Sequence, residues 1–205
     1  MAGRLTDRDK KCYEMVLKSR LIFNVNQLAR IFYNQSSNVS SAETICARRL
    51  KVLEAGQYLF KVNHRAFGQA QLWSGIKQNS SQTNHKLLLS EFWATLCSNG
   101  FQVLDIETEK QFLNGELRCD AFITAQYGDN KPFYIAVEAD LSKEFNAVGY
   151  ERLIDSIKNG STRFDKKLLI VSICDRKIES DVSRYVIQLK RDLSDWAKFQ
   201  YQFIK

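Results

Sequence analysis

Two apolar runs joined by a short polar turn constrain the fold of this chain more than any other feature. The runs are ELRCDAFITAQ (116–126) and FYIAVEA (133–139), and the turn between them is YGDNKP. Apolar runs of this length, bounded by turn residues, are typical of β-strands. If the strands pair antiparallel across the turn, Asp120 near the start of the first lies beside Glu138 near the end of the second.

Further elements are expected on both sides of these strands. An amphipathic helix at 84–100 and a strand at 101–108 precede them. A helix at 143–159 with Ser142 as its cap, a buried strand at 166–174, a helix at 179–191 and a final strand at 197–204 follow them. The order α-β-β-β-α-β-α-β predicts an α/β domain with a mixed sheet.

The first 76 residues show a different order. Thr6 is expected to cap a helix that runs to about Arg20, and two more helices are expected at 24–33 and 41–55. The extended runs YLFKVN and AQLWS then predict a hairpin. Three helices followed by a hairpin is the order of a winged helix-turn-helix.

The polar stretch SGIKQNSSQTN (74–84) separates these two parts of the chain. We therefore predict a winged helix-turn-helix domain at 1–76 and a mixed-sheet domain at 82–205. Together they form an α/β (α+β) protein.

The third helix has two unlike faces. At about 100° per residue, one stripe is apolar, comprising Ala42, Cys46, Leu50 and Leu53. The opposite face has the polar and basic composition of a helix that enters the major groove of DNA. The predicted DNA contacts are Ser41, Thr44, Arg48, Arg49 and Lys51 on this helix and Lys61, His64 and Arg65 on the hairpin. Arg49 lies at the edge of the apolar stripe and is expected to reach a phosphate. The alternative is an ordinary solvated basic face.

The charge is unevenly distributed along the chain. Residues 1–80 hold 13 Lys and Arg against 5 Asp and Glu, a net charge of +8. Residues 81–205 hold 17 against 18, a net charge of −1, so the whole excess lies in the first part. This asymmetry favours an anionic partner for the first domain, with duplex DNA as the expected one.

Other features bear on the compartment. The first residues are charged throughout and lack the apolar core of a signal peptide, and no apolar run is long enough for a membrane span. The five cysteines are scattered and form no C-x-x-C pair, which favours buried thiols over a disulfide framework. We expect a cytoplasmic protein with no membrane partner. No apolar stripe identifies an oligomer interface, so a homodimer stays open.

Three carboxylates lie at the ends of the paired strands. Glu138 and Asp140 project from the same face of their strand, and Asp120 is their expected neighbour. Convergent carboxylates suit Mg²⁺, which can activate water for phosphodiester cleavage. The strand order and these acids match the layout of the PD-(D/E)xK nuclease fold, a restriction-endonuclease-like domain.

This site departs from the nuclease pattern in two places. Cys119 replaces the Pro, and Asp140 stands where the Lys is expected, which reverses the charge beside the scissile phosphate. Lys143 is the candidate substitute. Two interpretations remain open: a degenerate site that does not cut, and a Mg²⁺-dependent endonuclease with Asp120, Glu138 and Asp140 as catalytic and metal-binding residues.

The winged helix, together with NHKLLLSEFW, LRCDAFI and VEADLSKEF…YERLI, resembles the replication-relaxation family over roughly residues 6–175. His85, Asp120 and the Glu138-x-Asp140 pair match the family pattern, although the role of His85 stays open. Similar sequences occur among mobilisation accessory proteins of the MobC type. The resemblance implies a DNA-binding accessory protein of plasmid replication or mobilisation with a degenerate nuclease-like domain. Its implied partners are duplex DNA and relaxase or replication proteins, and DNA binding requires no cofactor. A transcriptional regulator is a further alternative.

Overall fold

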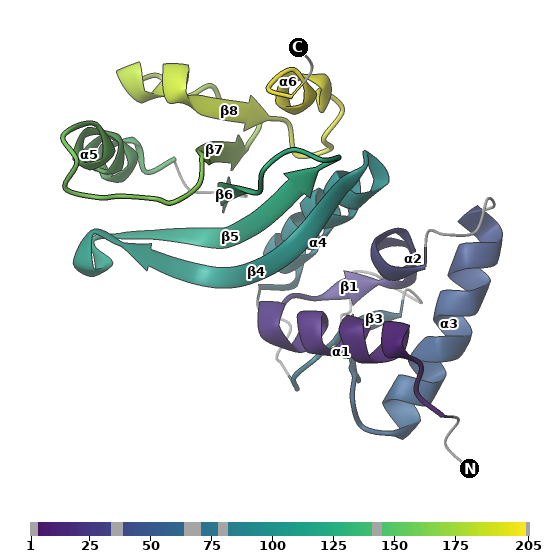
Figure 1. Ribbon diagram of the computed structural model, residues 1–205. Coiled ribbons are helices and arrows are strands. Elements are labelled where there is room, and N and C mark those ends of the chain that lie inside the picture. Colours follow the sequence, from purple (N-terminus) through teal and green to yellow (C-terminus); the bar gives the residue numbers. More distant parts are fainter. Residues whose placement is uncertain (1–3, 34–38, 64–70, 78–81, 141–144, 204–205) are drawn as a thin grey trace. The chain divides into compact units, whose positions relative to one another are not determined.

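The computed structural model describes residues 4–33, 39–63, 71–77, 82–140 and 145–203. Within them the chain is mixed α/β, with six α-helices, a three-stranded sheet and a mixed five-stranded sheet (Figure 1). The fold divides into two compact units, Met1–Phe101 and Gln102–Lys205. No helix within the described ranges is long and apolar enough to cross a membrane.

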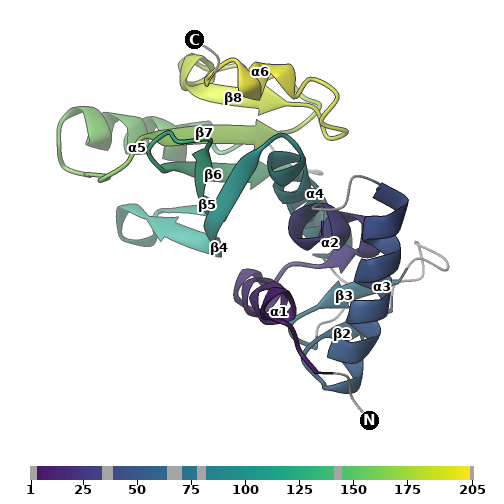
Figure 2. The ribbon, with the colours of Figure 1, turned by 45° about the vertical axis from the view of Figure 1, so that its right-hand side comes forward.

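The first unit contains the expected three helices and hairpin (Figure 2). Its elements are α1 (Asp7–Ser19), β1 (Phe23–Asn24), α2 (Val25–Phe32), α3 (Val39–Ala55), β2 (Phe60–Val62), β3 (Leu72–Ser74) and α4 (Thr83–Ser98). The strands pair antiparallel in the order β1-β3-β2. Thr6 caps α1 as predicted, and Asn24 caps α2 in the same reciprocal manner with Gln27. The short strand β1 was not expected from the sequence.

Helix α4 packs against α2 within the first unit. The indole of Trp93 is fully buried and makes edge contacts with Phe23 at 5.5 Å and with Phe32 at 6.0 Å. The Ser90 hydroxyl donates to the carbonyl oxygen of Ile22 at 2.7 Å. We had expected this helix to open the second domain. Its apolar face is instead covered by α2 and β1, so the boundary between the two units follows Phe101.

The second unit is built on the five-stranded sheet. Its elements are β4 (Phe101–Phe112), β5 (Leu117–Tyr127), β6 (Phe133–Ala139), α5 (Ala147–Lys158), β7 (Leu168–Ile173), β8 (Val186–Leu189) and α6 (Ala197–Gln200). The strand order is β4-β5-β6-β7-β8, with β5 and β6 antiparallel and β6, β7 and β8 parallel. The predicted mixed sheet and the predicted hairpin are both present.

Helices α5 and α6 cover opposite faces of this sheet. Tyr150 of α5 reaches Glu138, whereas Phe203, just after α6, packs on Phe133 at 4.7 Å. Phe133 and Glu138 are an odd number of positions apart on β6, so they point to opposite faces. Both faces of the central strands are therefore buried, which explains why β6 and β7 are almost wholly apolar.

Two predicted elements near the C-terminus are wrong. The helix expected at 179–191 is a 3₁₀ turn, Asp181–Tyr185, followed by β8, because the run Val186–Leu189 adds a parallel strand beside β7. The strand expected at 197–204 begins instead with α6, because Trp196, Phe199 and Phe203 recur at helical spacing and their rings pack together. The expected cap Ser142 lies outside the described residues.

Candidate functional site

Helix α3 divides into the two faces that its sequence predicts. Ala42, Cys46, Leu50 and Leu53 are 0–5 % exposed and form the inner stripe. On the outer face Ser41, Thr44, Arg48 and Lys51 are all exposed. Neither the Arg48 nor the Lys51 side chain forms an ion pair or hydrogen bond with another residue that the structure describes. Two cations on one exposed helix face are therefore available to an anionic ligand.

Arg49 has a structural partner in place of the expected phosphate. Its guanidinium forms an ion pair with Asp9, with 3.1 Å between Nε and Oδ1, and it also donates to the carbonyl oxygen of Arg4 at 2.9 Å. The Asp9 side chain is completely buried, and a buried carboxylate requires a counter-charge. Arg49 therefore ties α3 to the start of α1.

Asp9 is the centre of a buried hydrogen-bond network. Its carboxylate accepts hydrogen bonds from the backbone and hydroxyl of Thr6, each at 2.7 Å, and from the Tyr33 hydroxyl at 3.1 Å. Burial alone would raise the pKa of Asp9, but the hydrogen bonds from Arg49 and Thr6 outweigh it and lower the pKa to about 2. Asp9 is thus ionised at neutral pH and fixes the position of α3 within the first unit.

The hairpin residues named as DNA contacts are only partly described. Lys61 on β2 forms an ion pair with Glu54 at 3.0 Å, and its ammonium lies 5.4 Å from the centre of the Trp73 ring. His64 and Arg65 lie outside the described residues. Because Lys61 already has an anionic neighbour, α3 carries the most accessible positive charge among the named contacts that the structure describes.

The two carboxylates Asp120 and Glu138 are neighbours, as the hairpin predicts. The adjacent pair in the register is Ala121 and Val137, and the backbone N–H of Ala139 donates to Asp120 Oδ2 at 2.8 Å. The Tyr150 hydroxyl donates to Glu138 Oε1 at 3.0 Å from α5. The contact of Tyr150 with Glu138 was not predicted, because no local sequence motif marks a residue that reaches the sheet from the next helix.

The electrostatics of this pair favour a retained proton. Burial, and then the charge of Asp120, raise the pKa of Glu138 to about 9. Burial and the nearby charge of Asp120 thus favour the protonated form of Glu138 at neutral pH. Burial also raises the pKa of the Cys119 thiol well above its ordinary value. Chemically, the pair can hold one proton, or a cation in its place.

Of the two remaining residues named for this site, Asp140 and Lys143, only Asp140 lies within the described part of the chain. Asp140 directly follows β6, where its N–H donates to the Ile173 carbonyl oxygen at 3.0 Å and its own carbonyl oxygen accepts from Arg191 Nε at 3.0 Å. Its charge contributes to the raised pKa of Glu138. Lys143 lies outside the described residues. His85 is half-buried on α4, in the first unit. Among the described residues, no group of three or more His, Cys, Asp or Glu side chains is arranged to hold a metal ion.

Comparison with family models, with curated proteins and with solved structures gave no match.

Proposed function

We propose that this protein is a DNA-binding accessory protein of plasmid or mobile-element replication or mobilisation, and that it holds duplex DNA through α3. The observation that carries the proposal is the outer face of α3, where Arg48 and Lys51 are exposed and form no ion pair with described residues. An exposed helix with basic and small polar residues on one face suits the major groove and its phosphates.

The topology of the first unit supports the same assignment. The order α1-β1-α2-α3-β2-β3, with the strands arranged β1-β3-β2, is the order of a winged helix. In that arrangement α3 is the recognition helix. The excess positive charge of the first 80 residues would favour association with DNA from a distance.

For the second unit we propose a degenerate nuclease-like domain that contacts relaxase or replication proteins. The succession β4-β5-β6-α5-β7, with Asp120 and Glu138 side by side, supports a nuclease-like ancestry. In the nuclease pattern Asp140 stands where the catalytic Lys is expected, and a protonated Glu138 lowers the negative charge that a divalent cation would require. Both features favour a domain that no longer cuts.

The test is a gel-shift assay with duplex DNA. Arg48→Ala and Lys51→Ala are each expected to weaken binding, because each removes a phosphate or base contact. Lys11→Ala is the matched control, since Lys11 is an exposed lysine of α1 in the same unit. Unchanged affinity in both α3 variants would remove α3 from the interface.

The second candidate function is a Mg²⁺-dependent endonuclease, favoured by the neighbouring positions of Asp120 and Glu138 on the paired strands β5 and β6. It is tested by incubating the protein with plasmid DNA and Mg²⁺ or Mn²⁺. Cleavage that is lost in both Asp120→Ala and Glu138→Ala would establish this function. Intact DNA with either metal would support the degenerate site.

A further inference from the structure

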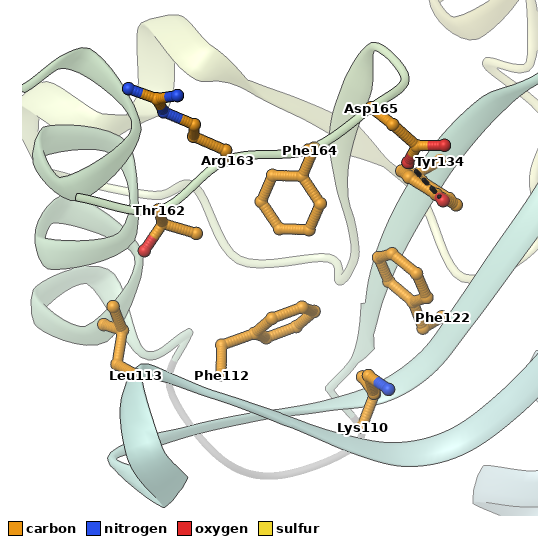
Figure 3. A pocket seen from close by; sticks show the side chains of 9 residues that line it. All are labelled: Lys110, Phe112, Leu113, Phe122, Tyr134, Thr162, Arg163, Phe164 and Asp165. Carbon is orange, nitrogen blue, oxygen red and sulfur yellow. Dashed lines mark hydrogen bonds between the residues drawn. The ribbon is translucent and has the colours of Figure 1, made fainter. Parts of the chain in front are cut away.

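A pocket of about 420 Å³ with aromatic walls lies in the second unit. Four rings line it, from Phe112, Phe122, Tyr134 and Phe164 (Figure 3). Their centres are 4.9 to 6.4 Å apart where they touch. Phe112 is buried, but the other three rings remain partly exposed to solvent. The volume falls within the range of small-molecule sites, and aromatic walls are common in such sites.

The ring of Tyr134 is held in place by polar contacts at its far end. Its hydroxyl donates to Asp165 Oδ1 at 2.7 Å and accepts from Lys166 Nζ at 3.0 Å. Lys166 also forms an ion pair with Asp165 at 2.7 Å, which offsets the negative charge beside the pocket. Because the hydroxyl is already hydrogen-bonded, Tyr134 offers a ligand mainly the face of its ring.

Two cations lie at the rim. Arg163 forms no hydrogen bond or ion pair with any described residue, and Figure 3 shows its guanidinium pointing away from the rings. Lys110 is half-exposed and pairs with Glu107 at 2.9 Å. The rings and the Arg163 cation would therefore meet different parts of one ligand, a planar part inside and an anionic part at the rim.

We propose that this pocket takes one unpaired nucleotide of a single-stranded DNA segment, with the base against the rings and the phosphate at Arg163. Bases of any sequence stack on aromatic side chains, and Arg is well suited to phosphate. An apolar side chain of a partner protein would pack against the rings but would leave the Arg163 guanidinium without an anionic ligand. The site is separate from the duplex contact of α3 and does not rest on it.

Tyr134 also shares a face of β6 with Glu138, four residues further along, which is about 13 Å on a strand. A strand of DNA held in the pocket would thus run close to the carboxylate pair on the same sheet.

The test measures the anisotropy of a short fluorescein-labelled oligothymidylate with the full chain. All proteins carry Arg48→Ala and Lys51→Ala, so that α3 does not contribute. Phe164→Leu is expected to weaken binding about tenfold, since it removes one stacking ring. Arg163→Gln is expected to weaken it severalfold. The control Lys177→Gln removes an exposed cation at the other end of β7 and is expected to leave the affinity unchanged.

Circular dichroism of each variant reports whether the fold is retained, and Arg163→Gln carries the test if Phe164→Leu does not fold. Equal affinity of Arg163→Gln and its parent would overturn the proposal. An equal loss in Lys177→Gln would also overturn it, because binding would then follow net charge. Thymidine monophosphate is expected to compete with the oligonucleotide at concentrations where inorganic phosphate does not, and competition by phosphate alone to the same extent would contradict a role for the rings.

Discussion

Replacing Asp9 by Asn tests how α3 is held in the first unit. The network around Asp9 lowers its pKa from the ordinary value of 3.8 to about 2. A lowered carboxyl pKa stabilises the folded state above the unfolded pKa, and this contribution is lost as the pH falls through the folded pKa. It corresponds to about 2 kcal/mol at pH 7 and to about half of that at pH 3. Asp9→Asn is expected to lose this contribution at every pH.

The assay is urea unfolding followed by tryptophan fluorescence. In a Trp196→Phe background the signal comes from Trp73 and Trp93, which both lie in the first unit. The difference between the parent and Asp9→Asn is expected to be about 2 kcal/mol at pH 7 and clearly smaller at pH 3.

The matched control is Asp7→Asn, in the same turn of α1, where the side chain is 99 % exposed. Its cost is expected to stay within about 0.5 kcal/mol. The reasoning would be refuted if Asp9→Asn had the same cost at pH 7 and pH 3. The loss would then come from packing, and the ion pair with Arg49 would contribute nothing measurable.

Two further perturbations address other parts of the fold. Because the pKa of Glu138 is raised to about 9, its contribution is fully present below the unfolded value of 4.5 and is lost as the pH rises through 9. Glu138→Gln is therefore expected to gain stability relative to the parent as the pH rises from 5 to 8, and parallel thermal-unfolding profiles across this range would contradict a protonated Glu138. In Gly75→Ala, the new Cβ would lie 2.4 Å from the Leu17 Cα of α1. Chemical unfolding is expected to show a loss of about 1–3 kcal/mol, and an unchanged midpoint would mean that α1 and β3 are not packed this closely.

The features that the sequence predicted correctly depend on local spacing. The two faces of α3 follow from helical periodicity over a single segment, and every predicted core residue of the stripe is buried. The neighbouring positions of Asp120 and Glu138 follow from a short turn between two strands, which leaves little freedom in their register.

The features that could not be predicted from the sequence depend on contacts between residues far apart in the chain. Arg49 looked like a phosphate contact because its buried counter-ion, Asp9, lies forty positions earlier and is brought to it only by the packing of α1 on α3. Helix α4 looked like part of the second domain because it follows a polar stretch, but the partners of Trp93 are on β1 and α2. The aromatic pocket combines rings from three strands and a connecting segment, so no single stretch of sequence predicts it.

The segment after β7 shows a different limit. Its pattern fits a helix and a strand about equally well. Parallel pairing with the edge of β7 stabilises the strand, β8. The alternation in 197–204 predicts a strand, but the same aromatic residues also recur at helical spacing, and the contact of Phe199 with Trp196 and Phe203 favours the helix.

The salt dependence of duplex DNA binding tests the central claim, that the exposed cations of α3 hold DNA, most directly. The logarithm of the binding constant is expected to fall linearly with the logarithm of salt concentration, with a slope of about −0.9 for each phosphate contact. Arg48→Ala with Lys51→Ala is expected to reduce this slope by up to about 2, whereas Lys11→Ala leaves it nearly unchanged. Equal slopes for the parent and the double variant would contradict the account.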